Sequence, residues 1–250
     1  MRVAALYDIH GNLPALEAVL DEVRRANVDR LVIGGDVLPG PMPRETLDRV
    51  LGLDMPTQFI HGNGDRVVHA QMTGGDIGEV PEPYRDGIRW TAQQLNIDHQ
   101  RALAGWPPTC RVEVDGIGDV LFCHATPRND REIFTRLTPD DRLVPIFDAV
   151  HAAAVVCGHT HMQFDRTIGR TRVVNAGSVG MPFARPAGAH WLLLGPDVQL
   201  RHTVYDFEQA AARMRSTTCP QVETLAVRYV LQPPSETEMV DMFERVAFQE

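Results

Sequence analysis

The sequence predicts an α/β fold in which strands and helices alternate first and hairpins come later. Apolar runs at residues 1–7 and 30–33 enclose an amphipathic segment at about 13–26, which is the pattern of a β-α-β unit. Later apolar runs come in pairs joined by short glycine-containing turns, which is typical of antiparallel hairpins. This order predicts a mixed sheet, or a pair of sheets, with helices on the outside.

The first sixty residues predict three strands whose ends carry polar side chains. The strand at 1–7 ends in Asp8 and His10, and Gly11-Asn12 then turns the chain into a helix. The strand at 30–33 ends in Gly34-Gly35-Asp36, where glycines allow a close approach of the backbone. A short helix near 45–51 precedes a third strand at 58–60, which leads into residues 61–65.

Strand signals disappear between residues 66 and 108. A glycine-rich loop near 74–75 is followed by helical patterns at about 84–95 and 98–104. We expect a helical insertion near residues 74–108 that lies over the site.

The second half of the chain predicts hairpins around a further strand and helix. Paired runs at 111–114 and 119–123, 163–168 and 171–175, and 189–194 and 199–205 predict the hairpins. A helix near 140–150 leads into a buried strand at 152–157, which ends in Gly158-His159-Thr160-His161.

The length of 250 residues predicts a single domain over 1–250. We expect a core of about 1–205 and a C-terminal extension, 206–250, with a helix at 207–214 and apolar stretches at 225–231 and 236–246. The sequence assigns this extension no function.

The composition restricts the partners of the protein. A formal charge of -9 argues against extended binding to nucleic acid, although a local positive site can still hold a single nucleotide. The four cysteines show no Cys-x-x-Cys spacing and are expected to be reduced and mostly buried. No apolar run of membrane-spanning length and no leader pattern is present, so we expect a cytoplasmic protein.

Ligand-type side chains come directly after the predicted strands, where ligands bind in open α/β sheets. Residues two apart in an extended backbone project to the same face, so His159 and His161 can present two imidazoles to one point. The full set of strand-end candidates is Asp8, His10, Asp36, Asn63, His124, His159 and His161. The pattern predicts a metal site.

These motifs resemble those of the calcineurin-like metallophosphoesterases. The resemblance extends from residue 1 to about 200, and Asn12 and the run 175–180 resemble the small bacterial and archaeal phosphodiesterase-like branch. It implies a four-layer αββα sandwich of two mixed β-sheets flanked by helices. It further implies that one metal is held by Asp8, His10 and His161, the second by Asn63, His124 and His159, and that Asp36 bridges both.

The resemblance also implies an activity. Two divalent transition-metal ions, manganese first and iron, zinc or nickel as alternatives, suit imidazole and carboxylate ligands. With Asp36, Asn63 and His124 as catalytic residues, a metal-bridging hydroxide would hydrolyse a phosphodiester, slightly favoured, or a phosphomonoester. The partner would be a small phosphate ester or a nucleotide. The oligomeric state stays open.

Three further side chains are candidates for substrate binding. Arg128 lies in the loop after His124, and its planar guanidinium suits phosphate, although it could equally be a surface residue. Asn12 and Asp65 could also cap the helices that begin after them.

One position departs from the family pattern. Many members have a histidine proton donor after the asparagine, whereas this chain has Gly64. Loss of a donor costs about two to four powers of ten in rate. We expect open space beside the second metal and a preference for esters with good leaving groups.

Two other functions compete with this one. A metal-dependent amidohydrolase also uses a His-x-His pair, but on the first strand of a TIM barrel, whose eight βα units are not visible here. A catalytically idle scaffold of the same fold could act by binding protein, as one subunit of the eukaryotic retromer does. Retention of all the ligand-type residues argues against the scaffold, because such groups are costly to bury without a metal.

Overall fold

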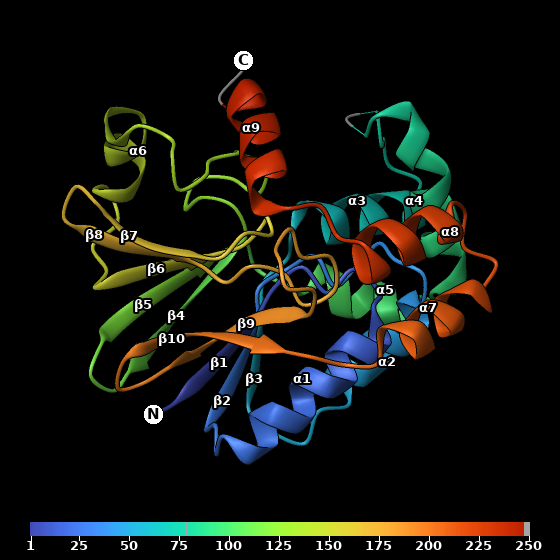
Figure 1. Ribbon diagram of the computed structural model, residues 1–250, viewed down its shortest axis with the longest axis horizontal. Helices are drawn as coiled ribbons and strands as arrows, with labels where there is room; N and C mark the ends of the chain where they lie inside the picture. Colours follow the sequence, from blue (N-terminus) through green and yellow to red (C-terminus); the bar gives the residue numbers. More distant parts are fainter. Residues whose placement is uncertain (79, 248–250) are drawn as a thin grey trace.

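The structure is a computed structural model that describes residues 1–78 and 80–247. Two five-stranded sheets pack face to face, with helices outside them (Figure 1). The first sheet has the order β10-β9-β1-β2-β3 and the second has the order β4-β5-β6-β8-β7. The strands are β1 Val3–Leu6, β2 Arg30–Ile33, β3 Thr57–Phe59, β4 Thr109–Val114, β5 Gly118–Cys123, β6 Ala154–Cys157, β7 Phe164–Ile168, β8 Thr171–Asn175, β9 Ala189–Leu194 and β10 Val198–Thr203.

The helices form two groups. In Figure 1, α6 lies beside the second sheet, whereas α1 lies against the first, and α2 and α7 lie farther out on the side away from α6. The helices are α1 Leu13–Arg25, α2 Pro43–Leu51, α3 Asn63–Met72, α4 Glu82–Gln94, α5 Ile97–Ala104, α6 Asp140–Phe147, α7 Phe207–Arg215, α8 Val222–Leu225, the π-helix η1 Ala226–Leu231 and α9 Glu236–Val246. None of the helices described is both long and apolar enough to span a membrane.

Strand β1 shows why the sheets form two layers. Its side chains alternate, so Ala4 and Leu6 join the core under α1, while Val3 and Ala5 point into the space between the sheets. That inner core also contains Phe122 of β5. A third cluster fills the space between the second sheet and α6. The predicted four-layer αββα sandwich is confirmed.

Both sheets are mixed. In the first, β1, β2 and β3 are parallel and β9 runs antiparallel to β1. In the second, β8 pairs antiparallel with β7, as its hairpin predicts, and also parallel with β6. The parallel pairs bring the carboxyl ends of β1, β2, β5 and β6 toward one region between the sheets.

The helical elements differ from the sequence prediction in two places. Helix α3 begins at Asn63, so Asp65 lies within its first turn and does not precede a helix that begins after it. The residues of the C-terminal extension also belong to the main core, because Met214 of α7 and Val230 of η1 pack in the cluster that contains α1.

Candidate metal centre

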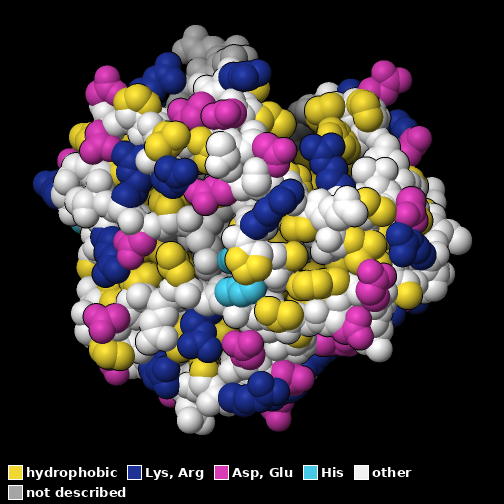
Figure 2. Space-filling view, in the orientation of Figure 1, with side chains coloured by type: hydrophobic (Ala, Val, Ile, Leu, Met, Phe, Trp, Pro, Cys, Tyr) yellow, Lys and Arg dark blue, Asp and Glu magenta, His cyan; other side chains and the backbone are white. Residues whose placement is uncertain are grey.

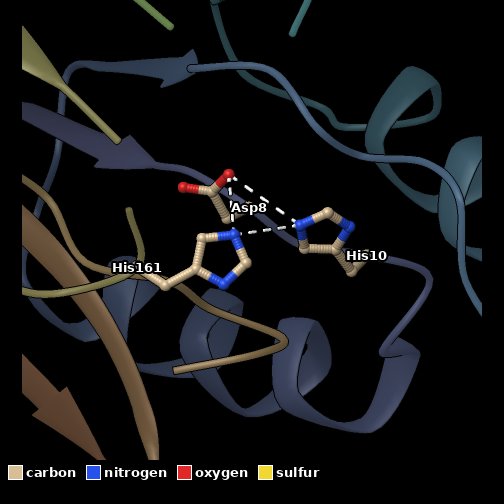
Figure 3. A group of neighbouring side chains, drawn as sticks. All are labelled: Asp8, His10 and His161. Carbon is tan, nitrogen blue, oxygen red and sulfur yellow. Dashed lines mark hydrogen bonds and ion pairs between the residues drawn. The ribbon is translucent and has the colours of Figure 1, made fainter. Parts of the chain in front are cut away.

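Two groups of side chains converge between the sheets. Asp8, His10 and His161 form one group, and Asp36, His124 and His159 form the other, each with its ligand atoms within 4.8 Å of one another. Figure 3 shows the first group, in which both imidazole rings turn a nitrogen toward the carboxylate of Asp8. The two Nε2 atoms of His10 and His161 lie 3.2 Å apart, and Asp8 Oδ1 lies 3.3 Å from His161 Nε2. Six of the seven predicted ligand residues, all except Asn63, therefore come together in these two groups.

Backbone strain is concentrated at these residues. Asp8, His10, Asp36, His159 and His161 have φ between 47° and 66°, a conformation that L-residues rarely adopt. Among the described residues other than glycine, only Asn27 and Gln221 share it. Such strain of about 1–3 kcal/mol per residue is typical of functional sites.

Backbone carbonyls orient three of the imidazoles. A carbonyl oxygen can only accept, so the N–H of His124 at Nδ1 donates to Gly34 at 3.0 Å, and that of His161 at Nδ1 donates to the carbonyl of Met181 at 2.6 Å. Each Nε2 then faces the site and has its lone pair available when the ring is neutral. His159 is turned the other way, because its Nε2 donates to the carbonyl of Arg131 at 3.1 Å and leaves Nδ1 for the site. This is the usual outer support of a metal-ligating histidine.

Three buried polar atoms in the site lack a hydrogen-bond partner among the described residues. They are Asp8 Oδ1, His124 Nε2 and Asn63 Oδ1. The other oxygen of Asp8 accepts the backbone N–H of His159 at 2.9 Å, which fixes the direction of Oδ1. Leaving such atoms buried without a hydrogen bond is costly. Carboxylate, imidazole and amide atoms in this arrangement fit divalent transition metals.

Asp36 lies between the two groups. Its Oδ2 is 3.5 Å from His124 Nε2 and 3.7 Å from His10 Nε2, while its Oδ1 accepts the backbone N–H of Gly64 at 2.7 Å. Gly62 makes this close packing possible, since a Cβ there would lie 2.1 Å from Asp36 Oδ1. The geometry suits a carboxylate shared by two ions.

Charge in the metal-free site is shared between carboxylates and imidazoles. Burial lowers the pKa of His124, but the carboxylates of Asp36 and Asp8 outweigh it and raise this pKa to about 10. Burial raises the pKa of Asp36, yet His124 and His10 hold that pKa well below its usual value. Burial and the positive charge of His124 lower the pKa of His159 to about 4.

We therefore expect metal binding to release protons. At neutral pH the metal-free protein carries a proton on His124, whose pKa is about 10, and a ligating Nε2 must be unprotonated. The metal affinity should fall as the pH is lowered. Titration calorimetry with Mn²⁺ in two buffers of different ionisation enthalpy measures the released protons, and equal heats in both buffers would contradict this.

The side chains of two candidate substrate-binding residues are hydrogen-bonded to backbone N–H groups. Asn12 accepts the N–H of Ala15 through its side chain and so caps α1, although it also lines the adjoining cavity. Asp65 is buried, and its two oxygens accept the N–H groups of Leu38 and Gly62. Asp65 thus ties the start of α3 to the loop after β2.

Arg128 lies outside the cavity that adjoins the metal centre. Its exposed guanidinium pairs with Glu132. Arg131, three residues along the same loop, lines the cavity instead. The sequence signal for an arginine after His124 was present, but it did not distinguish these two positions.

The space expected at Gly64 is filled. A Cβ built there would lie 2.3 Å from the carbonyl oxygen of Leu38 and 2.9 Å from Pro39. The loop after β2 therefore takes the place where the side chain of a donor would begin. The expectation of open space at this position is wrong, because sequence alone does not place that loop against α3.

The C-terminal extension packs behind His161, one of the candidate metal ligands. The ring of Phe183 stacks on His161 with centroids 4.9 Å apart. Phe183 in turn contacts Tyr229 of η1 and Phe243 of α9, with centroids 6.2 and 6.0 Å apart. The sequence shows the spacing of apolar residues in these helices, but it does not show that they pack against the ring of Phe183.

Comparison with known proteins agrees with this architecture. The family model for the calcineurin-like phosphoesterase superfamily domain matches residues 1–194. The uncharacterized protein MJ0912 of Methanocaldococcus jannaschii is 25% identical over 201 residues, which cover 72% of this chain and 76% of that one.

Two solved structures share the fold over nearly their whole length. The crystal structure of the hypothetical protein PH1004 from Pyrococcus horikoshii OT3 is similar with a TM-score of 0.78, 20% identity, and coverage of 94% of this chain and 99% of that one. That of a metallophosphoesterase from Sphaerobacter thermophilus has a TM-score of 0.71, 26% identity, and coverage of 93% and 99%. With its family model matched over most of its length and its strand-end ligands assembled, this chain belongs to the calcineurin-like phosphoesterase superfamily.

Proposed function

We propose that the protein is a dinuclear metal-dependent phosphoesterase that favours phosphodiesters over phosphomonoesters. The observation that carries the proposal is the pair of ligand groups, which contain orphaned buried atoms and share Asp36 between them. Asp8, His10 and His161 would hold one ion, and Asn63, His124 and His159 the other. We propose manganese as the native metal, on the chemistry of the donor set.

Other groups of the chain hold the candidate ligands in position. When bound by these residues, two divalent ions would supply the Lewis acidity for an in-line displacement at phosphorus. The carbonyls of Gly34, Met181 and Arg131 hold the imidazole rings in place, so little reorganisation accompanies turnover. Asp36, anchored by the N–H of Gly64, fixes the separation of the two groups.

The preference for diesters rests on the absence of a proton donor at Gly64. An alkyl monoester leaves as a poor alkoxide and depends on a donor, whereas an aryl diester departs as a stable phenolate. His10 is the only histidine among the described cavity-lining residues, and it belongs to a ligand group. This supports turnover of esters with good leaving groups.

The test is a pair of kcat/KM values for the manganese-loaded protein. We expect bis-p-nitrophenyl phosphate to exceed an alkyl monophosphate by at least about tenfold, within the range that one proton donor supplies. Preference for the alkyl monophosphate would contradict the diester assignment. Metal binding with hydrolysis of neither ester, nor of other phosphate esters in a screen, would favour the scaffold.

A further inference from the structure

A large cavity adjoins the metal centre. It measures about 660 Å³ and extends from His10, Asp36 and Asn63 to Arg228 and Tyr229 of η1. A phosphate group has only five heavy atoms and fills roughly 150 Å³ if each takes the volume of a water molecule. Ligand pockets of about 300–1,000 Å³ hold whole organic molecules. Most of the cavity is therefore available to the organic part of an ester.

Two segments outside the strand-end motifs form walls of the cavity. Tyr84, Gly87, Ile88 and Thr91 lie on one face of α4, at the spacing of successive helical turns. The opposite wall comes from the C-terminal extension. Its cavity-lining residues are Met214, Cys219, Pro220, Gln221, Thr224, Leu225, Arg228 and Tyr229. Figure 2 shows the molecule notched between α9 and α4, with hydrophobic side chains on the α4 side.

The lining of the cavity is mainly apolar. Val67, Val80, Ile88, Met214 and Leu225 line the cavity. Three amide side chains also line it: Asn63 is a candidate metal ligand, Asn12 is bonded to Ala15 and Gly180, and Gln221 donates to the carbonyl of Pro83. The hydroxyl groups of Tyr84, Thr91, Thr224 and Tyr229 also belong to the described lining, but they lie among apolar side chains. Burying a sugar or another polyol against those apolar side chains would cost more than burying an apolar group.

The charged residues in the described lining do not favour a cationic substituent either. Apart from the candidate ligands, the charged side chains in its described lining are Arg131 and Arg228, and Asp36 is the only acidic residue. Positive and negative side chains are interspersed over the outer face in Figure 2, so this bias is local. An anionic head group with an uncharged tail is the combination that fits.

We propose that this cavity selects phosphoesters that carry a hydrophobic organic group, with the phosphate at the metal centre and the apolar group between α4 and the C-terminal extension. The inference rests on the proposed function for the position of the phosphate. It gives the extension a role in substrate selection.

Binding of alkylphosphonates tests the cavity, because each carries one organic group and is not hydrolysed. Each methylene moved from water into the cavity is worth about fourfold in affinity (about 0.8 kcal/mol). By calorimetry on the manganese-loaded protein, we expect hexylphosphonate to bind at least tenfold more tightly than methylphosphonate. The 5-hydroxypentyl analogue, which is of equal length, should lose most of that gain. A flat series, or equal affinity for the hydroxylated analogue, would overturn the proposal.

The variant Gly87→Leu tests whether the organic group lies beside α4. A Cβ at Gly87 meets no atom within 4 Å, so the new side chain has room, and leucine favours the helix more than glycine does. We expect it to occupy the part of the cavity beside α4 and to reduce the gain of hexylphosphonate over methylphosphonate, with methylphosphonate affinity within twofold of wild type. Arg89→Leu, on the exposed surface of the same helix and outside the cavity lining, should keep the full gain. An undiminished gain in Gly87→Leu would overturn the assignment of the cavity.

These measurements separate the two proposals. Tighter binding of the longer phosphonates without hydrolysis of any phosphate ester would refute the phosphoesterase and leave the apolar cavity in place. Hydrolysis of bis-p-nitrophenyl phosphate without any chain-length gain would refute the cavity and leave the phosphoesterase in place.

Discussion

Replacement of Asp36 by Asn is expected to lower kcat/KM by a factor on the order of 10³ while the protein stays folded. Asn has nearly the same shape and can still accept the N–H of Gly64, which lies 2.7 Å from Oδ1. It removes the negative charge that faces His10 and His124 from 3.7 and 3.5 Å. The two ions would therefore lose their common anionic ligand.

The measurement is kcat/KM on bis-p-nitrophenyl phosphate at saturating Mn²⁺, with circular dichroism to verify the fold. Asp165→Asn is the matched control, because Asp165 lies exposed on β7 and pairs with Arg172 at the surface. That control should retain the wild-type rate. Near-native turnover by Asp36→Asn would refute the role of Asp36.

A side chain at Gly64 is expected to destabilise the protein and to lower its activity. The Cβ itself is the cause, since it would lie 2.3 Å from the carbonyl of Leu38 and 3.0 Å from Asp36 Oδ1. Relief requires the loop after β2 to move, and overpacking of this kind costs about 1–3 kcal/mol. The same shift would disturb the bond between Gly64 and Asp36. Gly64→His should therefore reduce hydrolysis of diesters and monoesters alike.

Thermal unfolding of the metal-free protein separates crowding from chemistry. Gly64→Ala should lower Tm in the same direction as Gly64→His, because both introduce the Cβ. Gly87→Ala, where a Cβ has open space, should raise stability by about 0.5–1 kcal/mol, as expected for glycine in a helix. An unchanged Tm in Gly64→Ala, or a selective gain in monoester hydrolysis by Gly64→His, would show that the position is open after all.

The sequence predicts the fold and the ligand groups for the same physical reason. Buried strands are recognisable as continuous apolar runs, and parallel strands bring the residues at their carboxyl ends to one edge of the sheet. Asp8, Asp36 and His124 could therefore be placed near one another without coordinates. The left-handed backbone of Asp8 and His161 could not be inferred in this way, because no glycine marks those positions.

Contacts between elements that are distant in the chain are not predicted by the sequence. An amphipathic helix shows which of its faces is buried but not which partner it meets. For that reason the sequence does not reveal that Phe243 contacts Phe183. Nor does it reveal that Phe183 stacks on His161. The obstruction of Gly64 by Leu38 is of the same kind, because it depends on how a loop packs against α3.

The number of metal ions per chain tests the central claim most directly. The protein would be stripped of metal, reconstituted with Mn²⁺, freed of excess by gel filtration and submitted to elemental analysis. Because the ligand atoms form two groups that share Asp36, the account predicts two ions per chain. One ion per chain, or none, would contradict the dinuclear centre.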